Sequence, residues 1–410
     1  MKKIYLLFFL PIFLWSQDLS ELINISQKNK LIQSSQETVE SVKDEYSSVK
    51  RSYLPNVSIG TSYQNTNRES QDMPANGYTS YAKVGLTIYD GNKRYNLFKS
   101  YKSYIKSSKE NLSALKNEVA LDVVNYYYQY LTLEAQKDAK QKEIEQLKSE
   151  GNRVKNFVDV GSATTDEYDK IESRIQSSIF DLNQIELNII TVLHTLEYVT
   201  GQEVSITAGS SIKDININSD MKAQRPDIKS LEYNIEKLKY DARQEKSGYL
   251  PKITLDNTYS YYDRNYKDNS IPEEYKDQNV FSVNLSWDIF NFNSTGKKYS
   301  ARYKEYLSKR SNYEYQKKKA DTELKTSLKT YEIGKVKVKA AKASLKAATS
   351  VYDSIKSKYQ NGLVDNVTFL EALTEKYDAL SQLKSSQYDL EINKATIIYY
   401  SGKNVGDYVE

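Results

Sequence analysis

The sequence contains no cysteine and only one histidine, His194. The lack of cysteine excludes a disulfide scaffold, a thiol nucleophile and a lipid anchor attached through cysteine. A lone histidine cannot form a cluster with metal-ligand spacing, and no glycine-rich phosphate-binding loop is present. We therefore expect no enzyme, no cofactor and no metal, and we expect His194 to be a packing or surface residue.

Long hydrophobic runs are missing from the interior of the chain, whereas a membrane-spanning helix needs about 20 consecutive apolar residues. The one apolar run, Ile4 to Trp15, lies at the start and follows Lys2 and Lys3. This layout predicts a signal peptide over 1–16, with an uncleaved anchor as the alternative. The 58 basic and 54 acidic residues give a net charge of +4. The sequence shows no clustering of basic residues of the kind that a nucleic-acid binder has.

The sequence contains an internal repeat. Tyr53-Leu54-Pro55 returns as Tyr249-Leu250-Pro251, an offset of 196 (249 − 53), and Gly161 returns as Gly362, an offset of 201 (362 − 161). Repeated units of this kind define the domain plan before any other feature. The plan we expect is a first repeat over 17–201, a linker over 202–224, a second repeat over 225–402 and a tail over 403–410.

Each repeat contains two segments in which apolar and polar residues alternate. Val57 and Ile59 alternate with Ser58 and Gly60, and the same pattern recurs in the other segments. Alternation with a period of two predicts strands with one apolar and one polar face. The expected strands are 56–68, 80–90, 252–264 and 279–290. The 37 tyrosines suit such strands, because tyrosine has an apolar ring and a polar tip that favour membrane interfaces.

The remaining sequence predicts helices, two of them very long. Within 94–158 an apolar residue recurs every seven positions from Phe98 to Val154, with Lys140 as the one exception, and within 297–360 the same spacing runs from Leu324 to Tyr359. A strict seven-residue repeat indicates coiled-coil packing, and about 65 residues of helix span about 100 Å. Hairpin turns are predicted at Gly161 and Gly362. The other expected helices are 18–52, 163–201, 225–247 and 363–402, with Pro55 and Pro251 marking the helix-to-strand junctions.

Four two-faced strands cannot close a barrel, and open sheet edges are not tolerated in hydrocarbon. Three chains would supply twelve strands, enough for a barrel with a polar interior. The expected fold is therefore mostly α with a small β part, in which long α-helical hairpins continue from a shared barrel. A soluble β-sandwich with coiled-coil arms is the alternative.

The chain resembles TolC-type outer-membrane efflux proteins over nearly all of its mature length. The resemblance rests on the two Tyr-Leu-Pro junctions, on Arg225-Pro226-Asp227, on the turns at Gly161 and Gly362, and on the helix ends at Gly201 and Gly402. Where the family usually has Asn-Pro in the first half, this chain has Asn29-Lys30.

The resemblance implies a homotrimer with a 12-stranded β-barrel in the lipid of a Gram-negative outer membrane and an α-helical periplasmic tunnel. It also implies a periplasmic membrane-fusion adaptor and an inner-membrane transporter of RND, ABC or MFS type. The expected function is passive exit of small molecules or drugs. The alternatives are an exit duct for type I protein secretion and, in a different class, a non-pore periplasmic or surface coiled-coil scaffold.

In this family the periplasmic entrance lies at the glycine turns, where acidic rings narrow the pore and favour cations. The residues that this implies here are Asp166, Asp365 and Glu371 for the constriction and Tyr359 for the closed gate. Val364 replaces the arginine that partners the tyrosine in relatives. The alternative for each carboxylate is an ordinary solvated helix charge.

Overall fold

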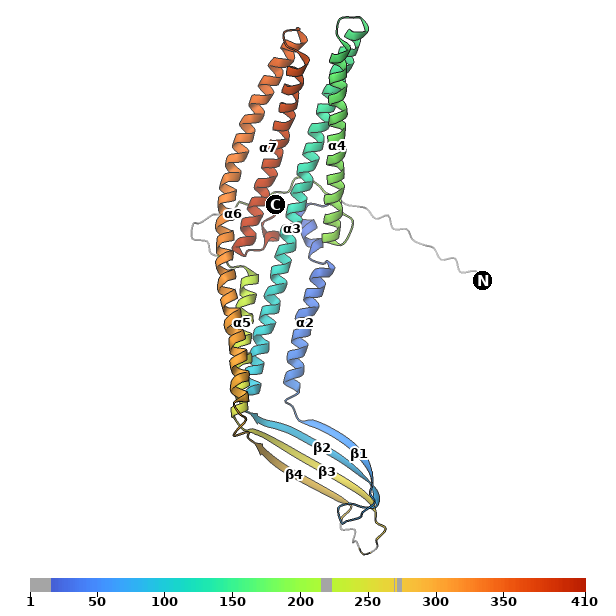
Figure 1. The fold of residues 1–410 in the computed structure, drawn as a ribbon, viewed down its shortest axis with the longest axis vertical. Helices are drawn as coiled ribbons and strands as arrows, with labels where there is room; N and C mark the ends of the chain where they lie inside the picture. Colours follow the sequence, from blue (N-terminus) through green and yellow to red (C-terminus); the bar gives the residue numbers. More distant parts are fainter. Residues whose placement is uncertain (1–15, 215–222, 269, 271–274) are drawn as a thin grey trace, which may run out of the picture. The chain divides into compact units, whose positions relative to one another are not determined.

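The computed structural model describes residues 16–214, 223–268, 270 and 275–410. The predicted signal peptide falls on residues that lie almost entirely outside these ranges. The chain forms two compact units, one made of residues 36–111 and 227–316 and the other of the remaining segments. We call the first the sheet unit and the second the hairpin unit (Figure 1).

The sheet unit contains four antiparallel strands in the order β1-β2-β3-β4. They are β1 (Asn56–Asn65), β2 (Asn76–Asp90), β3 (Lys252–Asn265) and β4 (Asp277–Ser286). The register places Val57 opposite Val84 and Leu255 opposite both Leu86 and Val283. Residues opposite each other share a face, so the predicted alternation produces one apolar face. That face is open to solvent in the single chain: the side chains that are at least 60% exposed include Val57, Ile59, Phe281, Val283 and Leu285.

Three strand ends differ from the expectation by three residues or more. β1 ends at Asn65, not at 68. β2 begins at Asn76, not at 80, because it pairs with β1 up to the Asn65–Asn76 pair. β4 ends at Ser286, not at 290, so Trp287 lies beyond the strand and its indole N–H donates to the Tyr249 carbonyl at 3.1 Å. Pairing stops there because β3 begins directly after Pro251, which has no N–H to donate.

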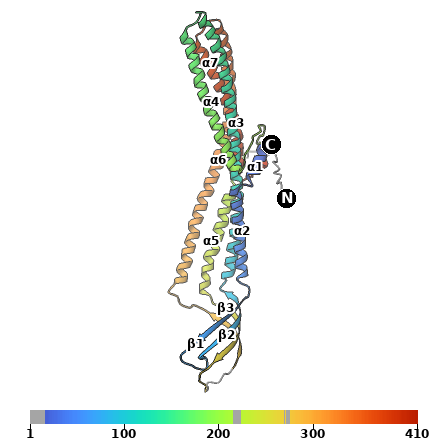
Figure 2. The same ribbon diagram turned by 90° about the vertical axis from the view of Figure 1, so that its right-hand side faces the viewer.

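Two long helices dominate the chain, α3 (Lys93–Asp159) and α6 (Ser294–Gln360). Each turns back into a shorter helix, α4 (Thr165–Thr200) or α7 (Asn366–Ser401). The two hairpins are seen from two directions in Figures 1 and 2. The remaining elements are α1 (Leu19–Ser26), α2 (Lys30–Arg51), α5 (Pro226–Glu245) and the 3₁₀ turns Lys246–Tyr249 and Val405–Tyr408. Among the described residues, every helix is too short or too polar to cross a bilayer.

The single helix expected over 18–52 is wrong, because the chain breaks between α1 and α2. Asn29 causes the break: its side-chain oxygen accepts the Ile32 N–H at 2.8 Å and so caps α2. Its amide nitrogen donates to the Val199 carbonyl at 2.9 Å. A side chain that satisfies the first N–H groups of a helix favours a helix start at that point. Asn29 therefore opens α2 without the proline that opens α5 at Pro226.

The main core of the hairpin unit lies where α1, α3, α4 and α7 meet. Its buried side chains include Leu19, Leu22, Val123, Tyr127, Tyr128, Leu196, Ile398 and Val405. The hydroxyls of Tyr127 and Tyr128 donate to the carbonyls of Thr207 and Ser210 at 2.8 and 3.1 Å. Buried tyrosines need such partners. The segment after α4 is thereby fixed against α3, and this core supports both hairpins.

Candidate constriction at the helix turns

Both hairpins turn through a glycine in the left-handed conformation, Gly161 at φ +74° and Gly362 at φ +72°. The turns close in the same way: the Ser162 N–H bonds to the Phe157 carbonyl at 2.7 Å, and the Leu363 N–H bonds to the Lys358 carbonyl at 2.9 Å. A Cβ at either glycine would meet no atom within 4 Å. Glycine is therefore required by the backbone angle and not by space.

Tyr359 lies one turn before Gly362 and faces the inside of the hairpin unit. Its ring stacks on Phe369 of α7, with centroids 4.7 Å apart and planes 15° from parallel. The guanidinium of Arg153, from α3, lies 4.9 Å from the same ring. Burial raises the pKa of Tyr359 to about 12. Tyr359 thus joins the α6–α7 hairpin to the α3–α4 hairpin as a neutral ring.

Arg153 is the residue that sequence reasoning missed. The resemblance led us to look for an arginine at position 364, which is valine, but the guanidinium on Tyr359 comes from the other hairpin. Arg153 also donates from Nε to Glu150 at 2.7 Å. A Glu–Arg pair three residues apart is an ordinary surface pair on a helix, so the sequence held no signal that set this one apart.

The two predicted aspartates at the turns both serve helix starts. Asp365 is the N-cap of α7 and accepts the Thr368 N–H at 2.9 Å. Hydrogen bonds from Thr368 hold the pKa of Asp365 below its usual value. Asp166 lies in the first turn of α4. A hydrogen bond from Thr164, followed by one from Lys170, lowers the pKa of Asp166. Both carboxylates are exposed and ionised, and both are engaged locally.

Glu371 lies on the exposed side of α7 and lines a shallow groove between α4 and α7. The groove also contains Lys170, Arg174, Val367, Leu370, Thr374 and Glu375. Lys170 reaches Asp166 at 3.3 Å. Lys170 and Arg174 are the only lysine and arginine of α4. The expectation of an acidic constriction therefore left out two cations that share the groove with Glu371.

Polar contacts also join the two hairpins close to the turns. Arg174 donates to the Thr374 hydroxyl at 2.7 Å, and the Asn366 amide donates to the Glu167 carbonyl at 2.9 Å. Behind them Glu143, with a side chain only 1% exposed, lies 2.7 Å from Lys140 and 3.4 Å from Arg174. Lys140 is the residue that interrupts the heptad series. It is accommodated because a buried carboxylate needs a charged partner.

The described part of the chain holds no group of three or more His, Cys, Asp or Glu side chains that could bind a metal. The arrangement at the turns can instead hold two hairpins together and present charge to a passing ion. The structure brings Tyr359 into contact with the other hairpin through Arg153. Asp166 and Asp365 instead lie at the starts of their own helices, and Glu371 lines the exposed groove. The roles of these residues in gating stay a prediction.

Comparison with known proteins supports this interpretation of the fold. The family model for outer membrane efflux proteins matches residues 23–202 and 218–403. Outer membrane protein TolC of Salmonella enteritidis is 20% identical over 372 residues, which are 85% of this chain and 74% of TolC. The match to the family model excludes the non-pore scaffold.

Solved structures give the same fold. VceC of Vibrio cholerae superposes with a TM-score of 0.84 at 12% identity, over 94% of this chain and 96% of that chain. The CmeC channel of Campylobacter jejuni gives 0.83 at 17% identity, over 95% of this chain and 86% of that chain. The fold class expected from the sequence, mostly α with four strands, is thereby confirmed. Since the family model covers both hairpins and the sheet, the chain belongs to the outer membrane efflux protein family and is an efflux channel of a Gram-negative outer membrane.

Proposed function

We propose that three copies of this chain form the outer-membrane exit duct of a tripartite export system. The observation that carries the proposal is the sheet with two unpaired edges, β1 and β4, and one solvent-exposed apolar face. Open edges do not persist in hydrocarbon, and twelve strands form a barrel wide enough for an aqueous interior. The apolar face then contacts lipid, and pairing between copies removes both edges.

The opposite face of the sheet is suited to line the pore. Lys83 of β2 lies 3.1 Å from Asp256 of β3, and the Asn284 amide of β4 donates to the same carboxylate at 3.1 Å. Ser58 lies opposite Lys83 on this face. A row of hydroxyl, amide and paired charged groups is stable in water and unfavourable against lipid. This face is therefore assigned to the interior.

Two structural repeats, over 17–201 and 225–402, supply the matching halves of each chain in this proposal. Their support is the shared order of elements and the matched turns at Gly161 and Gly362. The linker 202–224 and the tail 403–410 meet through the Ile212–Val409 bridge. In this proposal the signal peptide over 1–16 is cleaved off, which leaves the mature chain.

The proposed partners are a periplasmic membrane-fusion adaptor and an inner-membrane transporter of RND, ABC or MFS type. Each turn presents one large apolar side chain to solvent, Val160 or Leu363, and both are 73% exposed. Apolar side chains at the end of a tunnel are suitable contacts for a protein partner. The duct conducts passively, and the transporter supplies the energy, because we propose no catalysis by this chain.

The proposed cargo is small molecules, including drugs. A strain that lacks the chain should become sensitive to detergents and dyes while its secreted polypeptides are unchanged. Loss of a secreted polypeptide with unchanged sensitivity would assign the chain to type I secretion instead.

Channel formation is tested with purified full-length protein in planar bilayers and on gels run with and without heating. We expect discrete ion conductance and a trimer that dissociates on heating. Absence of both would reject the exit-duct proposal.

A further inference from the structure

One charged side chain, Arg264 of β3, lies near the end of the polar face of the sheet, the face assigned above to the pore interior. Residues an even number of positions apart on a strand share a face. Arg264 therefore lies on the same face as Asp256, which pairs with Lys83 at 3.1 Å. Past the Lys83–Thr258 pair, toward the loops, the other strand residues of this face are glycine, serine, threonine, tyrosine and glutamine. Among these strand residues, all of which the structure describes, Arg264 is thus the only charged one.

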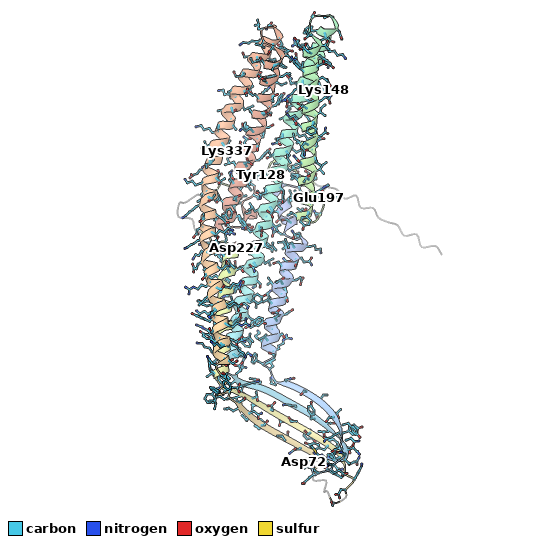
Figure 3. The ribbon with its side chains drawn as sticks, in the orientation of Figure 1. Asp72, Tyr128, Lys148, Glu197, Asp227 and Lys337 are labelled. Carbon is cyan, nitrogen blue, oxygen red and sulfur yellow. The ribbon has the colours of Figure 1, made fainter. Side chains whose placement is uncertain are left out.

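Arg264 lies next to the loops at the end of the sheet away from the helices. It is opposite Gly77, the second residue of β2. Asp72, in the loop that precedes β2, marks this end of the sheet in Figure 3. In the proposed duct the helices lie in the periplasm, so this end of the barrel opens to the exterior. Arg264 is therefore placed at the outer mouth.

Two tyrosine rings hold the guanidinium of Arg264 in place. Its central carbon lies 3.9 Å from the ring centroid of Tyr262 and 5.4 Å from that of Tyr275. The two rings meet edge to face, with centroids 5.7 Å apart. The Tyr262 N–H donates to the Lys276 carbonyl at 2.8 Å, which keeps the neighbouring Tyr275 beside the strand. The attraction of a cation to aromatic faces thus positions Arg264.

The N–H edges of this guanidinium are available to a ligand. Among the described residues, Arg264 has no ion pair and donates no side-chain hydrogen bond. The residue beside it on β2 is Gly77, where a Cβ would lie 2.4 Å from the Asp263 carbonyl oxygen. That position therefore excludes a side chain, and the space next to the guanidinium stays open. A planar guanidinium with free N–H groups matches the two oxygens of a carboxylate or phosphate.

We propose that three Arg264 side chains, one from each copy, form a cationic ring at the outer mouth that binds small molecules carrying carboxylate or phosphate groups. Rings of arginine or lysine are the means by which pores select anions and phosphates. Because Arg264 is held by rings and not by a carboxylate, its full charge acts on the pore. This inference rests on the proposed trimeric duct and adds acidic small molecules to the cargo that its exit accepts.

The test uses purified full-length protein in planar bilayers, with inositol hexakisphosphate as the probe anion. Since no described helix can cross a bilayer, the helices stay on the side of protein addition and the loops face the other chamber. The probe should reduce the current when added on the loop side. In Arg264→Gln the concentration needed for half block should rise by about tenfold or more, the loss expected for one charge-assisted hydrogen bond.

Arg68→Gln is the matched control, because it removes the same charge from the exposed β1–β2 loop at the same end of the sheet. Its half-block concentration should equal that of the natural protein. Raising the salt from about 0.1 M to about 1 M should weaken the block in the natural protein, because the Debye length falls from about 10 Å to about 3 Å. An equal loss of block in Arg68→Gln and Arg264→Gln would overturn the ring.

Arg264→Lys separates charge from geometry. It should keep the natural reversal potential in a salt gradient, whereas Arg264→Gln should shift that potential toward cation preference. It should nevertheless weaken the block, because lysine lacks the planar pair of donors. Trimers that dissociate on heating show that each variant assembles. Unchanged block in conducting Arg264→Gln trimers would overturn the ring and leave the exit duct intact. An unmodified chain that neither conducts nor forms trimers would reject the duct and the ring together.

Discussion

The Arg153 guanidinium lies 4.9 Å from the ring of Tyr359, which in turn stacks on Phe369 at 4.7 Å. One residue of the α3–α4 hairpin therefore contacts an aromatic pair built by the α6–α7 hairpin. A cation over an aromatic face contributes about 1 kcal/mol where it is partly shielded from water. Position 364, where the resemblance led us to expect an arginine, is valine, so the cation that contacts Tyr359 in this chain is Arg153.

Arg153→Ala should weaken the contact between the hairpins and raise the conductance of resting channels. Single-channel recording in planar bilayers measures the effect. Arg153→Lys should restore it only in part, because lysine lacks the planar guanidinium. The control is Lys148→Ala, which removes an exposed charge from the same helix. Equal conductance in Arg153→Ala and the natural protein would show that the stack does not restrain the channel.

Charge changes in the groove should shift ion selectivity in opposite directions. Glu371→Gln together with Asp365→Asn should weaken the preference for cations, whereas Lys170→Gln should strengthen it, because Lys170 shares the groove with Glu371. Reversal potentials in a salt gradient measure both. Potentials that stay unchanged in both variants would place the constriction elsewhere. A cation preference that persists below pH 4, near the ordinary carboxyl pKa, would agree with the lowered pKa of Asp365.

The hairpin unit should lose stability in strong alkali. Burial raises the pKa of both Tyr352 and Tyr359 to about 12, from an unfolded value near 10. The unfolded chain therefore releases these protons at lower pH than the folded chain does, so the stabilisation is complete below pH 10 and is lost as pH rises through 12. Thermal unfolding followed between pH 9 and 12 measures the slope. Tyr359→Phe should make it shallower, and an unchanged slope would contradict the assignment.

Gly161→Ala and Gly362→Ala should each destabilise the hairpin unit by about 1–2 kcal/mol, the cost of the left-handed conformation for a residue with a Cβ. No neighbour obstructs the added methyl group, so the loss of stability measures only the cost of the backbone conformation. Denaturant unfolding measures it. Ser162→Ala, at the next position, is the control and should have little effect. If both glycine variants were as stable as the natural protein, the turns would have to relax to another conformation.

Elements with a strict period were predictable from the sequence, and single contacts were not. The alternation around Val57 and Ile59 predicted a two-faced strand because each side of a sheet imposes the same choice at every second residue. The seven-residue series predicted both long helices for a similar reason. The break between α1 and α2 was not predictable, because the single side chain of Asn29 caps α2 and overrides the periodicity that surrounds it.

At the candidate constriction the sequence located the turns but not their partners. Gly161 and Gly362 were predictable because only glycine adopts their backbone angle without strain. Arg153 on Tyr359 depends on how two hairpins are placed, and no local pattern encodes that. The same holds for Lys170, whose pairing with Asp166 spans only four residues but whose position beside Glu371 depends on the packing of α4 against α7.

The central pair of the sheet joins β2 to β3, and its register runs from Asn76 opposite Asn265 to Asp90 opposite Lys252. The partners are thus 189 to 162 positions apart along the chain (265 − 76 and 252 − 90). Such a high contact order slows folding, because closing a long loop costs entropy before any pairing compensates for it. During synthesis β2 has no partner beyond β1 until α3, α4 and α5 have emerged. The exposed first hairpin of strands is therefore the part of the nascent chain that most needs a holding chaperone on its way to the membrane.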